Sequence, residues 1–230
     1  LIQCAGYMRM YHHKYLELLS EACREFNIHL IADEIAVGFG RTGTMFGFQQ
    51  AKITPDIICL SKGITGGYMT LSTILTTDDI YDAFYDEYEK LNAFLHSHSY
   101  TANPIACSAA NATLDIFRDK DVIKKNKILS AHMRKCFESL KDHPHVSDVR
   151  QKGMVLAIEL IKDKKRKVSY DWKERRGIRA YLHGLKNNVL MRPLGNVLYF
   201  MPPYVITKKE ISFVSEIMKE GVDEATKKNS

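Results

Sequence analysis

The chain has 230 residues and a mass of 26.4 kDa, and 45% of its residues are hydrophobic, 26% charged and 10% aromatic. These fractions are close to globular averages and exclude a disordered, collagen-like or coiled-coil chain. No apolar run approaches the ~20 residues that cross a bilayer, and the first residues lack the layout of a signal peptide. We therefore expect a soluble, cytoplasmic globular piece of a longer chain, with no membrane partner.

The basic residues exceed the acidic ones by 33 to 27, and the excess is concentrated between residues 162 and 176. A nucleic-acid surface would interleave such charges with aromatic side chains for stacking, and only Tyr170 and Trp172 lie here. A solvated turn is the favoured interpretation, with no nucleic-acid partner. The charged side chains are Lys162, Lys164, Lys165, Arg166, Lys167, Lys173, Arg175 and Arg176.

The cysteines and histidines indicate neither a disulfide framework nor a metal site. Five cysteines are scattered without a Cys-x-x-Cys pair, which favours buried, reduced thiols in a cytosolic protein. The pairs His96 and His98, and His143 and His145, have no carboxylate or cysteine at ligand spacing. We expect no bound metal.

Apolar patterns in the first half of the chain predict helices alternating with short strands, of which the first two are expected to be buried. The expected strands cover residues 29–32, 56–60 and 69–76, and the expected helices cover 12–26, 103–117 and 122–140. Asn103 followed by Pro104 is a typical helix start. Such alternation indicates an α/β fold with a mainly parallel sheet.

The pattern changes toward the C-terminal end, where strands and helices suggest a small α+β domain. The expected strands are 146–150, 154–160 and 197–201, and the expected helices start near Asp171 and after Thr207. Glu174 completes an acidic variant of a cap with Asp171, and Glu210 completes a capping box with Thr207. We place the domain boundary between residues 120 and 121.

Two charged side chains follow apolar strands in the first half. Asp33 ends the first strand and Lys62 follows the second, and glycine-containing turns come after both. Ligands in open α/β sheets bind beyond the carboxyl ends of the strands. A partly desolvated lysine there can form a Schiff base, and a neighbouring carboxylate can bind a protonated pyridine nitrogen. By position alone, such a lysine is more often an ordinary surface residue.

The sequence motifs around Asp33 and Lys62 are more specific than the positions of these two residues. Asp33–Gly43 (DEIAVGFGRTG) and Ser61–Gly67 (SKGITGG) resemble the signature of class III aminotransferases, which are fold-type I enzymes that use pyridoxal 5′-phosphate (PLP). Further segments are similar to the branch of that class that aminates 8-amino-7-oxononanoate, with S-adenosylmethionine as amino donor, in biotin biosynthesis. These segments are Gly6–Tyr11, Met69–Ser72, His96–Cys107 and Arg192–Tyr204. The resemblance covers nearly the whole chain.

The resemblance implies a role for several side chains. Lys62 would bind PLP as a Schiff base and move the reacting proton, and Asp33 would pair with the ring nitrogen. Ile35 would pack on the ring face, or be an ordinary core residue. Arg192 would receive the substrate carboxylate bidentately, and Tyr199 would line the same pocket.

Three residues depart from the pattern of the class. Ser99 stands where a phosphate-binding threonine comes from the neighbouring subunit of a homodimer with shared active sites, and it keeps the hydroxyl. His98 stands where a proline lies beside that threonine, and Ser97 where a glycine lies near the substrate. The resemblance thus makes His98 and Ser99 candidates for cofactor binding and Ser97 for substrate binding. Arg41 belongs to the motif but has no chemical role by this reasoning.

The resemblance also assigns residues 1–120 to a PLP-binding large domain and 121–230 to the small domain. The glycine–serine loop that grips the cofactor phosphate and the aromatic residues that close over substrate belong to the half of the class pattern outside this sequence. The 230 residues alone are therefore expected not to turn over substrate at a useful rate.

Alternatives remain open. Another class III enzyme acting on an ω-amine, such as ornithine or 4-aminobutyrate, would carry the same motifs, and lysine is a possible amino donor. The chain could also be an inactive, truncated interaction module that does not hold PLP.

Overall fold

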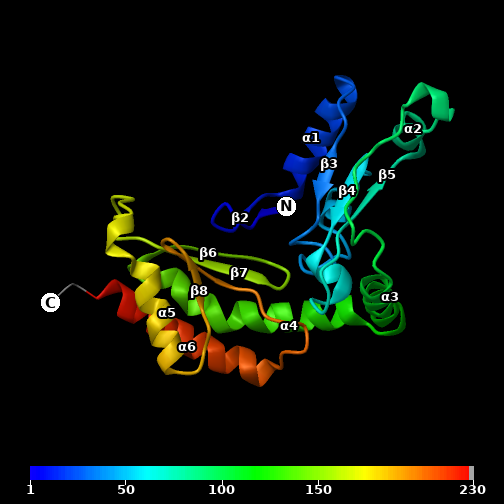
Figure 1. Ribbon diagram of the computed structural model, residues 1–230. Helices are drawn as coiled ribbons and strands as arrows, with labels where there is room; N and C mark the ends of the chain where they lie inside the picture. The colour runs from blue at the N-terminus through cyan, green and yellow to red at the C-terminus, as the bar shows by residue number, and fades with distance from the viewer. Residues whose placement is uncertain (228–230) are drawn as a thin grey trace. The chain divides into compact units, whose positions relative to one another are not determined.

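The computed structural model describes residues 1–227, and the chain folds into two compact units. The first unit contains Leu1 and His12–Asp121, and the second contains Ile2–Tyr11 and the chain from Val122 onward. Each unit is described separately (Figure 1). Within the described residues, no helix is long and apolar enough to cross a membrane.

The first unit is built on a three-stranded sheet with the order β3–β4–β5. β3 and β4 are parallel, with Asp33 opposite Cys59, and β5 pairs antiparallel with β4. The elements are α1 (His13–Glu25), β3 (Ile31–Asp33), η1 (Gly47–Ala51), β4 (Ile57–Leu60), η2 (Lys62–Thr65), β5 (Thr73–Thr76), α2 (Asp78–Asp82), η3 (Tyr88–Lys90) and α3 (Pro104–Asp119). The α/β fold and the start of α3, where Asn103 accepts from the amides of Ile105 and Ala106, are confirmed.

The third strand, β5, begins at Thr73 and is therefore shorter than the strand over residues 69–76 that the sequence predicts. The carbonyls of Met69 and Leu71 accept hydrogen bonds from the hydroxyls of Thr65 and Ser61, at 2.6 and 2.7 Å. These residues are therefore held in a loop by side chains instead of in the strand ladder.

The prediction that the first strand is buried is wrong for β3, where Ile31 is 58% exposed, and the second strand, β4, is buried only at Leu60. On the third strand, for which the sequence predicts no burial, Ile74 and Leu75 of β5 are 62% and 49% exposed. The buried apolar cluster around η2 and α3 consists of Phe39, Leu60, Ile64 and Ala110. The sequence showed that the strands are apolar, but burial also needs a neighbour, and within these residues nothing covers those side chains.

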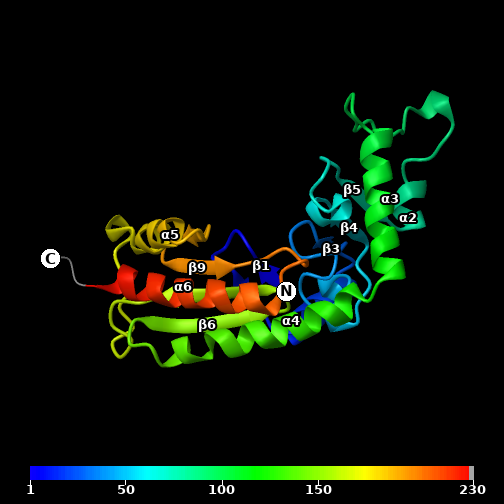
Figure 2. The same cartoon turned by 90° about the horizontal axis from the view of Figure 1, so that it is seen from below.

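The second unit has a four-stranded antiparallel sheet with the order β6–β7–β9–β8. Helices α4 and α6 pack on one face of this sheet, and a hairpin of β1 and β2 lies on the other (Figures 1 and 2). The elements are β1 (Ile2–Gln3), β2 (Arg9–Met10), α4 (Val122–Phe137), η4 (Glu138–Asp142), β6 (Val146–Lys152), β7 (Val155–Leu160), η5 (Trp172–Glu174), α5 (Arg176–Lys186), β8 (Arg192–Leu194), β9 (Val197–Phe200) and α6 (Lys208–Thr226).

The core of this unit lies between the sheet and the helices. Met133, Phe137 and Leu198 are fully buried there, and the final helix adds Ile211 and Val222 as its spacing predicts. The capping box is confirmed, because Thr207 Oγ1 accepts from the amide of Glu210 and the Glu210 carboxylate accepts from the amide of Thr207. The small α+β architecture follows from this packing.

The helix expected near Asp171 begins later. Asp171 accepts from the amide of Lys173 and caps only the 3₁₀ turn η5, and Arg175 then takes a left-handed backbone with φ 47°. Glu174 does not complete a cap. Its carboxylate instead accepts from the guanidinium of Arg176, a 5% exposed side chain, which lowers the pKa of Glu174. The helix α5 begins at this buried, hydrogen-bonded arginine, five residues after Asp171.

The remaining sequence features have ordinary structural roles. Residues 162–167 form an exposed turn closed by a bridge between Asp163 and Val168, as the solvated interpretation predicts. For Arg176 of the same basic block that interpretation is wrong, because this residue is buried. All five cysteines are free but half-buried, so the prediction of buried thiols is wrong in degree. Among the described residues, no group of three or more His, Cys, Asp or Glu could hold a metal ion.

Candidate functional site

Asp33 and Lys62 lie at the same edge of the first unit's sheet. β3 and β4 are adjacent and parallel, Asp33 is the last residue of β3, and Lys62 follows the end of β4 by two residues. The backbone continues this pairing by one step, because the amide of Glu34 donates to the carbonyl of Cys59 at 3.0 Å. The sheet topology thus brings together two residues that are 29 positions apart in the sequence.

Lys62 has an uncommon backbone. Its φ of 46° lies in the left-handed region, which costs a non-glycine residue about 1–2 kcal/mol. The next residue is tightly placed, since a Cβ on Gly63 would meet the Phe39 ring at 3.0 Å. The 3₁₀ turn η2 therefore fixes the backbone from which the exposed lysine side chain projects. Strained backbone of this kind is concentrated at functional sites.

The carboxylate of Asp33 is exposed and only partly engaged. Its Oδ1 accepts from the amide of Ile35 at 3.0 Å, which holds the side chain in an Asx turn. Within residues 1–227, Oδ2 accepts no hydrogen bond and the Lys62 ammonium has no ion pair. Both groups are open to a ligand at this edge.

Glu34 is a structural part of the site that the sequence did not single out. Its carboxylate is 4% exposed and accepts from the amides of Gly47 and Phe48, at 2.9 and 3.0 Å, while its carbonyl accepts from Gly38. Burial raises the pKa of Glu34, and the two amide hydrogen bonds oppose that shift. Glu34 therefore holds both ends of the glycine-rich loop directly after Asp33. The sequence signal that could have identified Glu34 was its position directly after Asp33, the candidate cofactor-binding acid.

Ser97, His98 and Ser99 lie on an exposed segment of the first unit. His98 organises it, because its amide donates to Thr101 Oγ1 and its Nδ1 accepts from the amide of Tyr100, both at 3.1 Å. The histidine that stands in place of proline thus builds a local turn of its own. Across the described chain, neither serine side chain has a hydrogen-bond partner, and the structure does not bring these three residues against Asp33 or Lys62.

Arg192 and Tyr199 face each other in the second unit. They are directly paired across β8 and β9, so their side chains share one face of the sheet. Arg192 is exposed and Tyr199 is half-buried. β8 was missed from the sequence, since only three residues form it and one of them is Pro193. An edge strand tolerates that proline.

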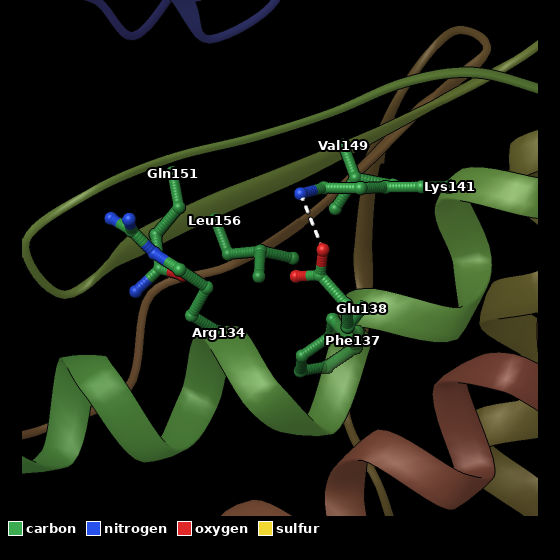
Figure 3. Close-up of a pocket in the computed structure, with 7 residues that line it drawn as sticks. All are labelled: Arg134, Phe137, Glu138, Lys141, Val149, Gln151 and Leu156. Carbon is green, nitrogen blue, oxygen red and sulfur yellow. Dashed lines mark hydrogen bonds and ion pairs between the residues drawn. The ribbon is translucent and has the colours of Figure 1, made fainter.

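A small cavity of about 220 Å³ lies elsewhere in the second unit, between α4 and the strands β6 and β7 (Figure 3). Val149, Gln151 and Leu156 point toward α4, and Lys141 bonds Glu138 across its mouth at 2.8 Å. None of the candidate site residues lines it, and its only acid is paired. The cavity therefore belongs to helix–sheet packing.

Comparison with known proteins gives the family. The protein-family model described as aminotransferase class III matches residues 1–222 of this chain. The chain is 47% identical over 231 residues to an adenosylmethionine-8-amino-7-oxononanoate aminotransferase of Helicobacter pylori, covering 99% of this chain and 51% of that protein. A counterpart from Geobacter sulfurreducens is 43% identical, with 98% and 50% covered. The chain spans about half the length of these curated relatives.

Solved structures agree. The crystal structure of the Methanocaldococcus jannaschii adenosylmethionine-8-amino-7-oxononanoate aminotransferase superposes with a TM-score of 0.92 at 40% identity, covering 97% of this chain and 52% of that one. An ω-transaminase from Pseudomonas jessenii, solved in complex with PMP, gives 0.91 at 28% identity, with 96% and 49% covered. The PLP-dependent, fold-type I character of the fold is thereby confirmed, and the chain belongs to the class III aminotransferases.

Proposed function

We propose that this chain carries the Lys62 half of an enzyme that transfers an amino group from S-adenosylmethionine to 8-amino-7-oxononanoate, giving 7,8-diaminononanoate. The observation that carries the proposal is the placement of Asp33 and Lys62 at the carboxyl ends of two adjacent parallel strands. The names of the relatives at 43–47% identity support the choice of substrates.

The residues at this edge fit PLP. The cofactor needs an amine for its aldehyde and a carboxylate for its ring nitrogen, and the exposed Lys62 and the open oxygen of Asp33 have those chemistries. PLP supplies an electron sink that stabilises the carbanion formed when a proton leaves the substrate. The residues that would hold it are Lys62 and Asp33, with Ser99 and His98 proposed near the phosphate.

The side chains of the chain then have separate tasks. Lys62 Nζ would act first as a general base, taking the proton from the substrate carbon, and then as a general acid, returning that proton later in the amino-group transfer. Asp33 would pair its carboxylate with the ring nitrogen and favour a proton there by charge. Arg192 receives the carboxylate of the acceptor in a bidentate contact, while Tyr199 and Ser97 line that pocket.

We further propose a homodimer with shared sites in the cytoplasm. The exposed 97–99 segment supports the shared site, because its hydroxyls are open to a group outside this chain. Five free thiols support a reducing compartment.

Amino-donor exchange tests the proposal. The chain is complemented with the half of the class III fold outside residues 1–230, loaded with PLP, and supplied with each donor in turn. We expect diaminononanoate to form with S-adenosylmethionine, and borohydride to fix PLP covalently on Lys62. Preference for 4-aminobutyrate or ornithine would replace the proposed substrates, and a protein that stays colourless in PLP would favour a non-catalytic module.

Arg192→Ala tests the acceptor pocket in the same assay. We expect the binding free energy of the acceptor to weaken by roughly 2–5 kcal/mol. This is the usual cost of truncating one residue of a charge pair that is buried in a complex. The loss should appear with the carboxylate acceptor and not with its methyl ester. An equal loss with both acceptors would contradict the role of Arg192.

A further inference from the structure

We propose that Arg150 is a positioning residue for the acceptor-carboxylate site, acting through the turn at Tyr7 and Met8. The inference rests on the proposed role of Arg192 and assigns to β6 and the N-terminal hairpin a part that neither the sequence nor the comparisons give them. It follows from three steps within the second unit.

Arg150 lies in the same row of the sheet as the proposed site. Strand pairing places Arg150 opposite Ala157, Ala157 opposite Tyr199, and Tyr199 opposite Arg192. Directly opposed residues on paired strands point to the same face. The opposite face is the one on which Val149 and Leu156 point toward α4 (Figure 3). Arg150, Tyr199 and Arg192 therefore share the face that the β1–β2 hairpin covers (Figure 1).

The guanidinium of Arg150 holds the hairpin to this face. Its Nε donates to the carbonyl of Met8 at 2.9 Å and its Nη2 to the carbonyl of Tyr7 at 2.6 Å. Its Nη1 bonds Glu159 at 2.6 Å and Asp148 at 3.0 Å, which orient the fork. The side chain is 14% exposed, so these charge-assisted bonds are partly shielded from water.

The backbone that Arg150 holds is strained. Tyr7 and Met8 have φ values of 61° and 53°, and two successive non-glycine residues in the left-handed region need an external restraint. Local amide bonds of the turn are long, at 3.3 Å from Met8 to Cys4 and from Arg9 to Gly6. Arg150 supplies stronger bonds to the two carbonyls and thus stabilises the turn.

The Tyr7 ring contacts the loop that joins β8 to β9. A Cβ on Gly195 would lie 3.3 Å from Cε1 of the Tyr7 ring, so the ring rests against this glycine. Gly195 has φ 57°, which glycine adopts without cost. β8 is a three-residue edge strand, and its placement depends on β9 and on this loop. The chain of contacts from Arg150 through Tyr7 and Gly195 therefore sets the position of Arg192.

The test compares Arg150→Lys, Arg150→Ala and a control, Arg166→Ala, in the complemented, PLP-loaded protein. Lysine keeps the charge for Glu159 and Asp148 but has one nitrogen and cannot form the fork. Arg166 is an exposed arginine of the same unit whose carboxylate contact, with Asp163, is 3.9 Å long. We expect both Arg150 variants to raise the KM for the carboxylate acceptor about tenfold or more with kcat within twofold, because both lose charge-assisted hydrogen bonds to the turn. With the methyl ester the KM should be unchanged.

Amide hydrogen exchange gives a readout without activity. In the same variants, the amides of Met8 and Arg9 should exchange at least tenfold faster, and those of α6 should not change. Equal losses with acid and ester, a fall in kcat alone, or unchanged exchange at Met8 and Arg9 would each overturn the proposal. If the wild type uses a different carboxylate-bearing amino acceptor, the proposed substrate is wrong, and the acid–ester comparison is made with that acceptor. If the wild type turns over no acceptor, the proposed function is wrong, and the part of Arg150 in acceptor binding is overturned with it.

Discussion

The two units differ in how their apolar side chains are used. In the second unit, Met133, Phe137 and Leu198 are fully buried between a four-stranded sheet and its helices. In the first unit, apolar residues of the strands, such as Ile31 and Ile74, are more than half exposed. The unit with the candidate Lys62 and Asp33 pair is thus the one whose sheet lacks cover.

This difference separates two requirements of the proposed enzyme. Local motifs on two adjacent strands are enough to place Lys62 and Asp33 at the same edge of the sheet, because β3 and β4 pair in parallel. Stabilising that arrangement requires apolar neighbours on both faces of the sheet. Exposed apolar patches mark interaction surfaces, so we expect the first unit to gain order when the rest of the class III fold is supplied.

The largest effect is expected for Lys62→Ala in the complemented protein. Removing the amine removes the proposed cofactor attachment and the proposed general base, so turnover should fall by a factor of ~10²–10⁴ or more. PLP should remain bound without the covalent link, because Asp33 and the proposed phosphate-binding residues are untouched. Product formation and borohydride trapping measure the two effects.

Lys120→Ala, an exposed lysine at the end of α3, is the matched control and should keep normal turnover. Near-normal transamination by Lys62→Ala would refute the central assignment.

A pair of leucine substitutions sharpens the comparison between the units. Leu198→Ala on β9 removes a fully buried side chain and should lower the free energy of unfolding of the second unit by about 2–5 kcal/mol. Leu75→Ala on β5, 49% exposed, should cost less than about 1 kcal/mol in the 230-residue chain. Denaturant unfolding of both variants measures the difference, and similar losses would show that the first unit is packed as tightly as the second.

Glu34→Gln tests the anchor of the glycine-rich loop. A glutamine can accept only one of the two amide hydrogen bonds from Gly47 and Phe48, so the loop should lose about 1–3 kcal/mol of local stability. Faster hydrogen exchange of these two amides, with α3 unchanged, is the measurement.

The same carboxyl predicts a pH dependence. Burial raises the pKa of Glu34 in the folded state, so the folded protein holds this proton more tightly than the unfolded chain. The contribution of Glu34 to stability is therefore fully present below the pKa of the unfolded chain and is lost as pH rises through the raised pKa of the folded protein. The advantage of wild type over Glu34→Gln should shrink with rising pH, and an advantage that grows would contradict the direction of the shift.

The smallest effect is expected for Thr207→Ala at the start of α6. The Thr207 hydroxyl caps the amide of Glu210 at 3.2 Å, and loss of such a cap typically costs ~1 kcal/mol. Thermal unfolding of the second unit should report a small decrease, while Thr207→Ser should retain wild-type stability. A loss as large as that of Leu198→Ala would mean that the cap has a further role.

The local features of this protein followed from the sequence. The caps at Asn103 and Thr207 and the spacing of Ile211 and Val222 are set by neighbouring residues, so the helices α3 and α6 were predicted with their starts. The motifs around Asp33 and Lys62 indicated the family, and these motifs are local too. The strand and the turn around each residue are encoded within a few positions of the sequence.

Only the tertiary structure determined the features that depend on distant residues. The exposure of Ile31, the late start of α5 at buried Arg176, and the edge strand that carries Arg192 all depend on which segments pack together. The hydrogen bonds of Arg150 join residues up to 143 positions apart, and no periodicity or propensity records such a pairing. Local sequence sets backbone preferences over a few residues, whereas burial and long-range hydrogen bonds are properties of the folded chain as a whole.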